Sequence, residues 1–366
     1  MCVGREYDVI IFLYPNFLIM TKNKYKYALV DLSYILARNA YMVAKNKKPG
    51  EYTPGEIIRL CIWSINKIPR DYNITADKFI LVSDKWDESI GGYYTTYMLK
   101  GNYKSDRGDQ NLTKGHGTYI TNEVYEEMKK DPSISKSDLE AAEGKLYFNN
   151  TKQAAKYGMI KDLGSIGIPS ILLPGWEYDN LAWLATNILY KDQDSKKSVL
   201  VTGDSDLLYS LSPKMDYFKL PLKGKNPKVV TYDEMYDTIP DDIKGKISLY
   251  NYHAMLDSLG EGHNMMRRTK ISGTNGKRIV ESLVLKGESS FIQDPELFRL
   301  QYGTFDITKY PGYDRAVELI SSLSKIGHYG NIDDFHKFIK KYNISGISDK
   351  YYSDFIERFD QKLFSE

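Results

Sequence analysis

Short apolar runs alternate with longer amphipathic stretches along the central part of the chain. The runs are Tyr27–Val30, Phe79–Ser83, Ser170–Leu173 and Val199–Thr202. Near-continuous apolar strands between helical stretches are typical of a parallel β-sheet that is covered by helices on both faces. We therefore predict an α/β fold with a mostly parallel sheet.

Beyond about residue 285 the pattern changes to apolar positions at helical spacing. It predicts helices over Tyr313–Lys325, Ile332–Tyr342 and Ser348–Phe364. The Tyr and Phe side chains of these segments are expected to pack in a core, because aromatic residues at helical spacing usually do so.

The N-terminal segment is apolar, but Pro15 and Asn16 interrupt it. Residues 1–20 are too short for a membrane span and lack a small-residue cleavage site, so we predict an N-terminal extension and no membrane association. The two cysteines of the chain cannot form a disulfide framework, which favours a cytoplasmic location. With 50 Lys+Arg against 48 Asp+Glu, any nucleic-acid binding must come from local basic patches.

Acidic residues follow the ends of the predicted strands. They are Asp31, Asp84, Glu177, Asp179, Asp204 and Asp206. The carboxyl ends of strands in an open α/β sheet border one crevice, so we expect these acids to meet there. The alternative for any one of them is that it only caps the following helix. A cluster of carboxylates without histidine or cysteine suits Mg²⁺ or Mn²⁺, and two such ions about 4 Å apart support phosphodiester hydrolysis.

Two neighbouring motifs carry a resemblance to a known family. LLPGWEYDNLAWLATN (172–187) and SVLVTGDSDLLYSL (198–211) resemble the 5′-nuclease family of flap endonucleases, phage 5′→3′ exonucleases and RNase H-type primer removers. Glu177 and Asp179 match the first two acids of its EADD-like stretch, and Asp204 and Asp206 match its D-x-D pair. Asn180 stands where the family has a third acid, so one of the two metal positions is expected to be weaker.

The segments 27–38 and 79–108 resemble the first two strands of that family and the entry to its helical arch. The resemblance implies that two Mg²⁺ or Mn²⁺ ions bind to the six acids named above. Tyr103, Lys104 and Arg107 match a Y-K-x-x-R pattern, whose Lys and Arg face the scissile phosphate while the Tyr stacks on a base. The alternative for this pattern is a solvated run of charges.

Residues 246–271 resemble, more loosely, the helix–loop–helix with which the family grips duplex DNA. Asp257 and Glu261 lie near the positions of two late metal-binding acids. A cluster of cations follows and is predicted to hold backbone phosphates without reading sequence: Arg267, Arg268, Lys270, Lys277 and Arg278. The alternative is a helix with a solvated basic face.

The resemblance covers about residues 27–280 and implies three regions. They are an extension at 1–20, a nuclease core at 21–245 with an arch at about 100–160, and a helical duplex-binding region at 246–366. We predict a monomeric, structure-specific 5′ nuclease that cleaves DNA flaps or RNA/DNA duplexes in replication or primer removal, with replication proteins as partners. It would act in the cytoplasm, which is the host cytosol for a phage protein.

Three other functions remain as alternatives. The first is a DNA-binding protein of the same family with a degenerate catalytic centre, which Asn180 favours. The second is a PIN-type ribonuclease, against which the long duplex-binding region and the D-x-D-L-L motif count. The third, a nucleotide-binding α/β protein, lacks a phosphate-cradling glycine loop after the first strand.

Overall fold

The structure is a computed structural model that describes residues 24–85, 87, 89, 92–99, 120–164, 168–189, 196–221, 227–261, 268–322 and 332–353. The side chains of Thr96, Tyr97, Leu189, Asp206 and Tyr209 are not part of the description. None of the helices in these ranges is long and apolar enough to span a membrane.

A mixed β-sheet forms the centre of the molecule, with the strand order β3-β2-β1-β4-β5-β6. Its strands are β1 (Tyr25–Asp31), β2 (Ala76–Val82), β3 (Ser170–Ile171), β4 (Ser198–Thr202), β5 (Met215–Lys219) and β6 (Lys228–Val230). All neighbouring pairs run parallel except β5 and β6. The predicted mostly parallel sheet is confirmed.

Helices flank the sheet in the chain order expected for α/β crossovers. They are α1 (Leu32–Ala44), α2 (Pro54–Asp71), α3 (Tyr94–Met98), α5 (Asn122–Lys130), α6 (Lys136–Leu163), α7 (Tyr178–Leu189), α8 (Tyr232–Tyr236), α9 (Leu249–Ser258), α10 (Gly276–Lys286), α11 (Pro295–Gly303), α12 (Tyr313–Ser322) and α13 (Ile332–Lys341). Two short 3-10 helices, η2 (Ser205–Ser210) and η3 (Ile307–Lys309), complete the described elements.

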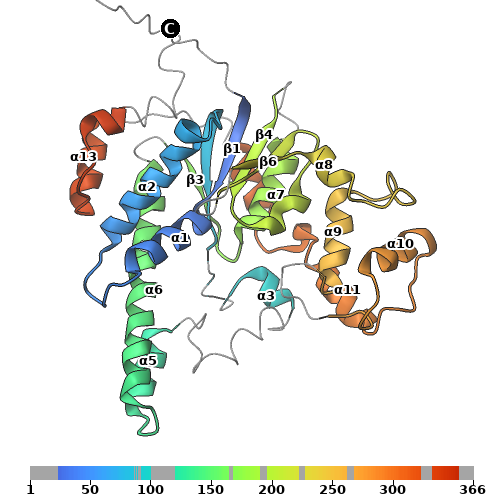
Figure 1. The fold of residues 1–366 in the computed structure, drawn as a ribbon, viewed down its shortest axis with the longest axis horizontal. Coiled ribbons are helices and arrows are strands. Elements are labelled where there is room, and N and C mark those ends of the chain that lie inside the picture. The colour runs from blue at the N-terminus through green and yellow to red at the C-terminus, as the bar shows by residue number, and fades with distance from the viewer. Residues whose placement is uncertain are drawn as a thin grey trace, which may run out of the picture.

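The two faces of the sheet bury two hydrophobic cores, because successive residues of a strand point to opposite faces. Along β1, Ala28 and Val30 join the core beneath α1, α2, α6 and α13. Tyr27 and Leu29 join the core beneath α7 and α9–α12. Figure 1 shows these two groups of helices on opposite sides of the sheet.

All four predicted strands are present, as β1 to β4, but their lengths differ from the apolar runs. β3 has only two residues because it pairs with just the last two residues of β2, Leu81 and Val82, at the edge of the sheet. The strand β5 was not predicted: its sequence MDYFK has charged residues at the second and last positions, and β4 supplies the pairing that makes it extended.

The α5–α6 hairpin projects beyond the ends of the strands, at the end of the sheet near which α3 lies (Figure 1). A capping bond begins α6, since Ser135 accepts a hydrogen bond from the Asp138 amide. The predicted arch at about 100–160 is therefore helical over α5 and α6, while residues 100–119 lie outside the described part of the chain.

The helices after residue 245 separate onto the two faces. Helices α9–α12 pack beside α7, whereas Phe335 and Phe338 of α13 are buried with α2 and α6. Gly158 of α6 allows this contact, because a Cβ there would lie 2.6 Å from the ring of Tyr342. The expectation that the late aromatic residues belong to a core is met at these positions, while the domain boundary at 245–246 stays a prediction.

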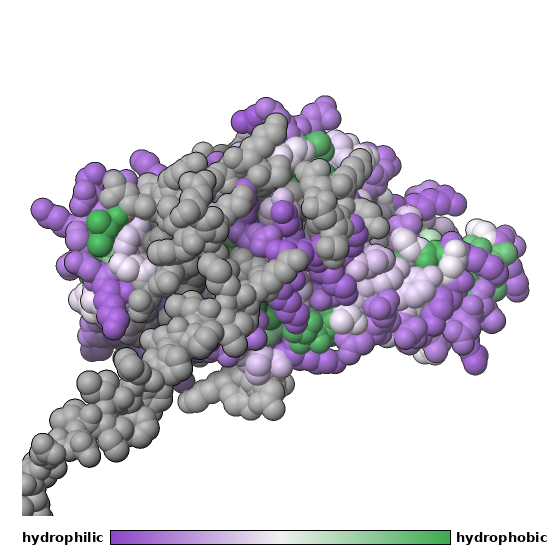
Figure 2. Space-filling model, turned by 90° about the horizontal axis from the view of Figure 1, so that it is seen from above, coloured by the Kyte–Doolittle hydropathy of each residue, from purple (hydrophilic) through white to green (hydrophobic). Residues whose placement is uncertain are grey.

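Figure 2 shows a largely hydrophilic surface over the described residues on the face seen from above, with small separate apolar patches. Exposed large apolar side chains lie far apart in the sequence, such as Met42 in α1 and Phe291 between α10 and α11. Scattered apolar residues of this kind are normal for a protein surface.

Candidate active site

Hydroxyl groups fasten the carboxyl ends of β1, β2 and β4 to one another. Thr202 Oγ1 donates to Asp31 Oδ2 at 2.7 Å and accepts from the Asp204 amide at 3.0 Å. Ser33 Oγ accepts from the Asp84 amide at 3.0 Å. Asp31, Asp84 and Asp204 are therefore held at neighbouring strand ends. Their hydroxyl partners stand beside the acids in the sequence, so this signal was present, but the sequence analysis did not use it.

Two of the acids also cap helices. Asp31 Oδ1 accepts a hydrogen bond of 2.8 Å from the Tyr34 amide in the first turn of α1. Asp84 Oδ1 accepts one of 2.6 Å from the amide of Tyr178, the first residue of α7. Negative charge at a helix N-terminus is favourable. The capping alternative thus applies to one oxygen of Asp31, whereas Asp84 contacts the start of α7 and not the helix that follows it in sequence, α3.

The turn before α7 brings Glu177 and Asp179 to the end of β2. Gly175 adopts φ +78°, and a Cβ there would lie 2.6 Å from the ring of Tyr94. The backbone of Lys85 bonds to this turn twice, donating to Trp176 O at 3.1 Å and accepting from Gly175 N at 2.8 Å. Only glycine satisfies both the conformation and the close ring contact.

The acids form one electrostatic cluster. Asp31 is buried, and desolvation followed by the charge of Asp84 raises its pKa to about 7. Desolvation and then the charges of Glu177, Asp204, Asp84 and Asp31 raise the pKa of Asp179 well above its ordinary value. Five of the six predicted acids therefore act on one another. Asp206 follows on η2, and its side chain lies outside the description.

This donor set fits divalent cations that prefer oxygen ligands. The clustered carboxylates, which together raise the pKa of Asp31 and Asp179, carry negative charge that a cation would compensate. Among the described side chains, no group of three or more Asp, Glu, His or Cys residues is arranged so that it could hold a metal ion. The fit therefore rests on the mutual placement and chemistry of the acids.

Asn180, at the position of the family's third acid, has an amide whose orientation Tyr310 determines. The Tyr310 hydroxyl donates its single hydrogen to Thr304 O at 2.8 Å and lies 3.1 Å from Thr95 Oγ1. Asn180 is also hydrogen-bonded to this hydroxyl, so it must present its Nδ2 donor. Its Oδ1 is buried and has no partner within the described structure.

Lys156, which the sequence analysis did not single out, lies beside the acids, and Lys152 lies one turn earlier on the same helix. Lys156 of α6 donates a hydrogen bond from Nζ to the backbone oxygen of Asp84. Lys152, one turn earlier, lies with Nζ 5.4 Å from the ring centroid of Phe148. Burial lowers the pKa of both ammonium groups. No motif marks these lysines, because only the packing of α6 brings Lys156 to the end of β2.

Of the helix–loop–helix predicted at 246–271, the structure describes α9, and the next helix, α10, begins at Gly276, beyond the predicted range. Glu261 forms an ion pair with Lys270, and its Oε1 accepts from the Gly276 amide at 3.1 Å. Lys270 also donates to Thr274 O at 2.6 Å and is 7% exposed. These contacts favour a structural role for both charged residues, and their predicted metal-binding and phosphate-binding roles stay predictions.

The remaining predicted residues of this region differ in exposure. Arg268, Lys277 and Arg278 are exposed on the loop and on the first turn of α10, where a phosphate backbone can reach them. Asp257 is buried near the end of α9. Four predicted residues lie outside the described ranges: Tyr103, Lys104, Arg107 and Arg267.

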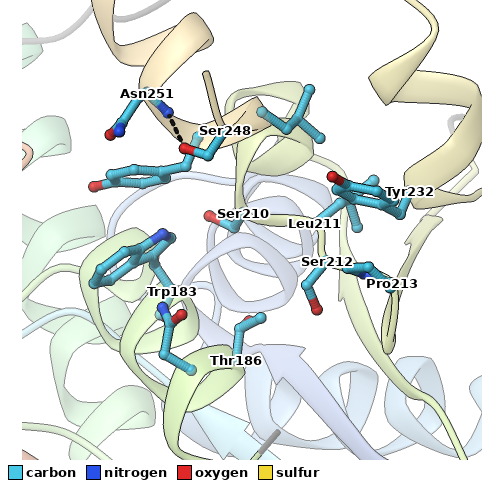
Figure 3. A pocket seen from close by; sticks show the side chains of 12 residues that line it. Trp183, Thr186, Ser210, Leu211, Ser212, Pro213, Tyr232, Ser248 and Asn251 are labelled. Carbon is cyan, nitrogen blue, oxygen red and sulfur yellow. Dashed lines mark hydrogen bonds between the residues drawn. The ribbon is translucent and has the colours of Figure 1, made fainter. Parts of the chain in front are cut away.

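A separate pocket of about 340 Å³ lies between α7, η2, α8 and α9. Figure 3 shows Trp183 and Tyr232 on its walls and the Ser210 hydroxyl between them. No charged side chain and none of the predicted site residues line it. It reaches Ser212 and Pro213, which precede β5, whereas the acids follow the opposite ends of the strands. The pocket is therefore not part of the acid centre.

No protein-family profile matches this sequence, and no curated protein matches it. Solved structures with a similar chain course include the D15 protein of phage T5 crystallised with metal ions, at 15% identity and a TM-score of 0.44, covering 91% of this chain and 99% of that one. Flap endonuclease-1 from Methanococcus jannaschii is 14% identical with a TM-score of 0.45, covering 94% of each chain.

Human GEN1 in complex with Holliday junction DNA is 12% identical with a TM-score of 0.46 and covers 93% of this chain and 75% of that one. At this level of identity the similarity concerns the fold. A flap endonuclease is thus among the structures to which this chain is similar, and flap endonucleases belong to the family that the sequence motifs resemble.

Proposed function

We propose that the protein is a metal-dependent 5′ nuclease that hydrolyses phosphodiester bonds near the 5′ end of DNA flaps or RNA/DNA duplexes. The observation that carries this proposal is the electrostatic cluster of Asp31, Asp84, Glu177, Asp179 and Asp204 at the carboxyl ends of the strands. The proposed cofactor is a pair of Mg²⁺ or Mn²⁺ ions, and the proposed setting is replication or primer removal.

The residues of the cluster have separate tasks in this proposal. Asp84, Asp179 and Asp204 would hold the cations, while Asp31 keeps both of its oxygens in bonds to Tyr34 and Thr202 that fix its orientation. When bound, divalent cations supply charge stabilisation to the reacting phosphodiester and acidity to water. Lys104 and Arg107 are proposed to face the phosphoryl oxygens from the arch, and Tyr103 to stack on an adjacent base.

Removal of the metal is the direct test of the proposed activity. We expect the purified protein to shorten a 5′-labelled flap duplex in Mg²⁺ and to leave it intact in EDTA, as judged by gel electrophoresis of the products. A DNA substrate and a matched RNA/DNA duplex, assayed in parallel, measure the preference between the two. Equal cleavage in EDTA, or none in either Mg²⁺ or Mn²⁺, would remove the basis of the proposal.

One observation favours a second candidate, a DNA-binding relative with a degenerate centre. Asn180 directs its amide nitrogen to Tyr310, so the third acid position lacks a charge. If this loss abolishes metal binding, the protein would bind a flap duplex with full affinity. It would not cleave that duplex, whichever divalent ion is added. The cleavage assay above therefore separates the two candidates.

Duplex binding is proposed to depend on the exposed cations at the start of α10. We expect the Lys277→Ala/Arg278→Ala variant to bind a blunt duplex more weakly, because each cation that neutralises a phosphate releases a condensed counterion. The slope of log affinity against log salt should flatten by up to about two, at roughly 0.9 per phosphate contact. The matched control is Lys286→Ala in the last turn of the same helix. An unchanged slope would identify these cations as a solvated helix face.

A further inference from the structure

The pocket of about 340 Å³ between α7, η2, α8 and α9 is a candidate ligand site separate from the acid centre. Three of its lining residues, Asn187, Pro213 and Asn251, are exposed, so the pocket is open to solvent. Its volume is near the lower end of the range of about 300–1,000 Å³ that small-molecule pockets have. A ligand the size of a single nucleoside is therefore expected to fit, whereas a larger molecule would be only partly enclosed.

Aromatic rings form two walls of this pocket. Trp183 packs against Tyr250 with the ring centroids 4.5 Å apart, and the Tyr250 hydroxyl donates to Phe305 O at 2.8 Å, which holds the pair in place. Tyr232 of α8 forms the second wall. Figure 3 shows the Ser210 hydroxyl in the space between Trp183 and Tyr232. Walls of this kind favour a flat ligand, because aromatic rings stack on one another or meet edge to face.

Two hydroxyl groups of the lining have no hydrogen-bond partner among the described residues. They are Ser210 Oγ, on a residue that is only 2% exposed, and Ser212 Oγ. Two other hydroxyls of the lining are satisfied locally. Thr186 Oγ1 donates to the main chain one turn earlier in α7 at 2.9 Å, and Ser248 Oγ accepts from the Asn251 amide at 3.1 Å. A buried hydroxyl without a partner is costly, so Ser210 favours a ligand that supplies one.

The chemistry of the lining selects for a neutral ligand. The lining residues include no acidic, basic or histidine side chain. A bound phosphate would therefore meet no cation and a bound ammonium group no carboxylate, and a buried charge without a partner is costly. Each serine hydroxyl both donates and accepts hydrogen bonds. The expected ligand is thus an uncharged flat ring that carries donors and acceptors on its edge.

We propose that this pocket binds a free nucleoside, with its purine or pyrimidine base between Trp183 and Tyr232. Nucleobases are neutral flat rings whose edges present hydrogen-bond donors next to acceptors. Ser210 Oγ and Ser212 Oγ would bond to this edge. The absence of cations from the lining favours a free nucleoside over a nucleotide or a base within a strand, since both of these carry phosphate. The inference does not depend on the proposed nuclease function, because the pocket lies apart from the acids.

The experiment is a titration of the whole protein with adenosine, guanosine, cytidine and uridine, followed by saturation-transfer NMR of the ligand. EDTA is present throughout, so that no metal-dependent cleavage contributes. The variants are Ser210→Ala and Tyr232→Leu. The matched control is Ser258→Ala, at a buried serine of α9 that does not line the pocket and whose Oγ donates to Ala254 O at 2.6 Å.

We expect at least one nucleoside to bind saturably. Ser210→Ala should weaken this binding by up to about tenfold through the loss of a hydrogen bond. Tyr232→Leu should weaken it by about tenfold through the loss of stacking. The 5′-monophosphate of the same nucleoside should bind more weakly than the nucleoside, because its charge meets no cation.

Protein stability supplies a readout that separates the pocket serine from its control. Ser210→Ala should be at least as resistant to thermal unfolding as the wild type, since its Oγ has no partner to lose. Ser258→Ala should unfold at a lower temperature, because it loses a buried hydrogen bond, and should bind the nucleoside as the wild type does.

The proposal is overturned if none of the four nucleosides binds saturably, or if both pocket variants bind as the wild type does. If Tyr232→Leu does not fold, Ser210→Ala decides the question. A short single strand that binds more tightly than every nucleoside, and whose affinity falls in Ser210→Ala, would assign the pocket to a strand and overturn the free nucleoside. An active nuclease that binds no nucleoside would refute only this pocket, whereas nucleoside binding by a protein that never cleaves DNA would refute only the nuclease function.

Discussion

The Asp204→Asn variant is expected to lose metal-dependent cleavage of a flap duplex by roughly 100-fold or more, the size of effect seen when one electrostatic contact of a catalytic centre is removed. The amide lacks the charge that a cation needs, while the backbone of residue 204 keeps its bonds to Thr202 Oγ1 and to the Tyr217 hydroxyl. The measurement is single-turnover cleavage at saturating protein in Mg²⁺.

A second readout of the same variant does not depend on activity. A cation that binds the folded protein at a hundred times its dissociation constant raises the free energy of unfolding by about 2.7 kcal/mol. Mg²⁺ should therefore raise the unfolding temperature of the wild type and have a smaller effect on Asp204→Asn. In EDTA the variant should be at least as stable as the wild type, because Asp204 contributes to the charge that raises the pKa of Asp31 and Asp179.

The control for both readouts is Asp241→Asn, the same chemical change at an exposed residue that pairs with Lys244. We expect this control to cleave DNA and to respond to Mg²⁺ as the wild type does. Full activity of Asp204→Asn, or an undiminished response to Mg²⁺, would show that the acid cluster is not the metal centre.

The Asn180→Asp variant is expected to require less Mg²⁺ for cleavage but to be less stable without metal. The new carboxylate adds charge beside Asp179, and it faces a Tyr310 hydroxyl whose hydrogen is already donated to Thr304 O. The free energy of unfolding in EDTA should fall by about 1–3 kcal/mol, the cost of a buried acceptor that loses its donor. Chemical denaturation and a Mg²⁺ titration of cleavage measure the two effects.

Tyr310 provides the means to separate these effects. Tyr310→Phe removes the hydroxyl oxygen that opposes the new carboxylate. Asn180→Asp should therefore lower the free energy of unfolding less in a Tyr310→Phe background than in the wild type. Asn187→Asp, at an exposed position on the same helix, serves as the control and should leave the Mg²⁺ titration unchanged. An unaltered titration in Asn180→Asp would place residue 180 outside the metal shell.

The order of apolar runs and acids along the chain was sufficient to predict the four strands β1 to β4 and the acids at their carboxyl ends. The cause is local: a buried parallel strand needs a continuous apolar run, and a residue that follows the run emerges at the carboxyl edge. Asp31, Asp84 and Asp204 illustrate this rule, since each lies at or just past the end of its strand. The helices of the C-terminal region followed from helical spacing in the same way, as α12 and α13 show.

The roles of individual polar groups were decided by tertiary contacts between segments distant in sequence. The packing of α6 brought Lys156 to Asp84, and η3 brought Tyr310 to Asn180, which set the orientation of that amide. The sequence predicted Glu261 as a metal ligand and Lys270 as a phosphate contact. In the structure, these two residues form an ion pair with each other. A local pattern specifies which face of an element a side chain occupies, whereas the partner it meets depends on how distant elements pack.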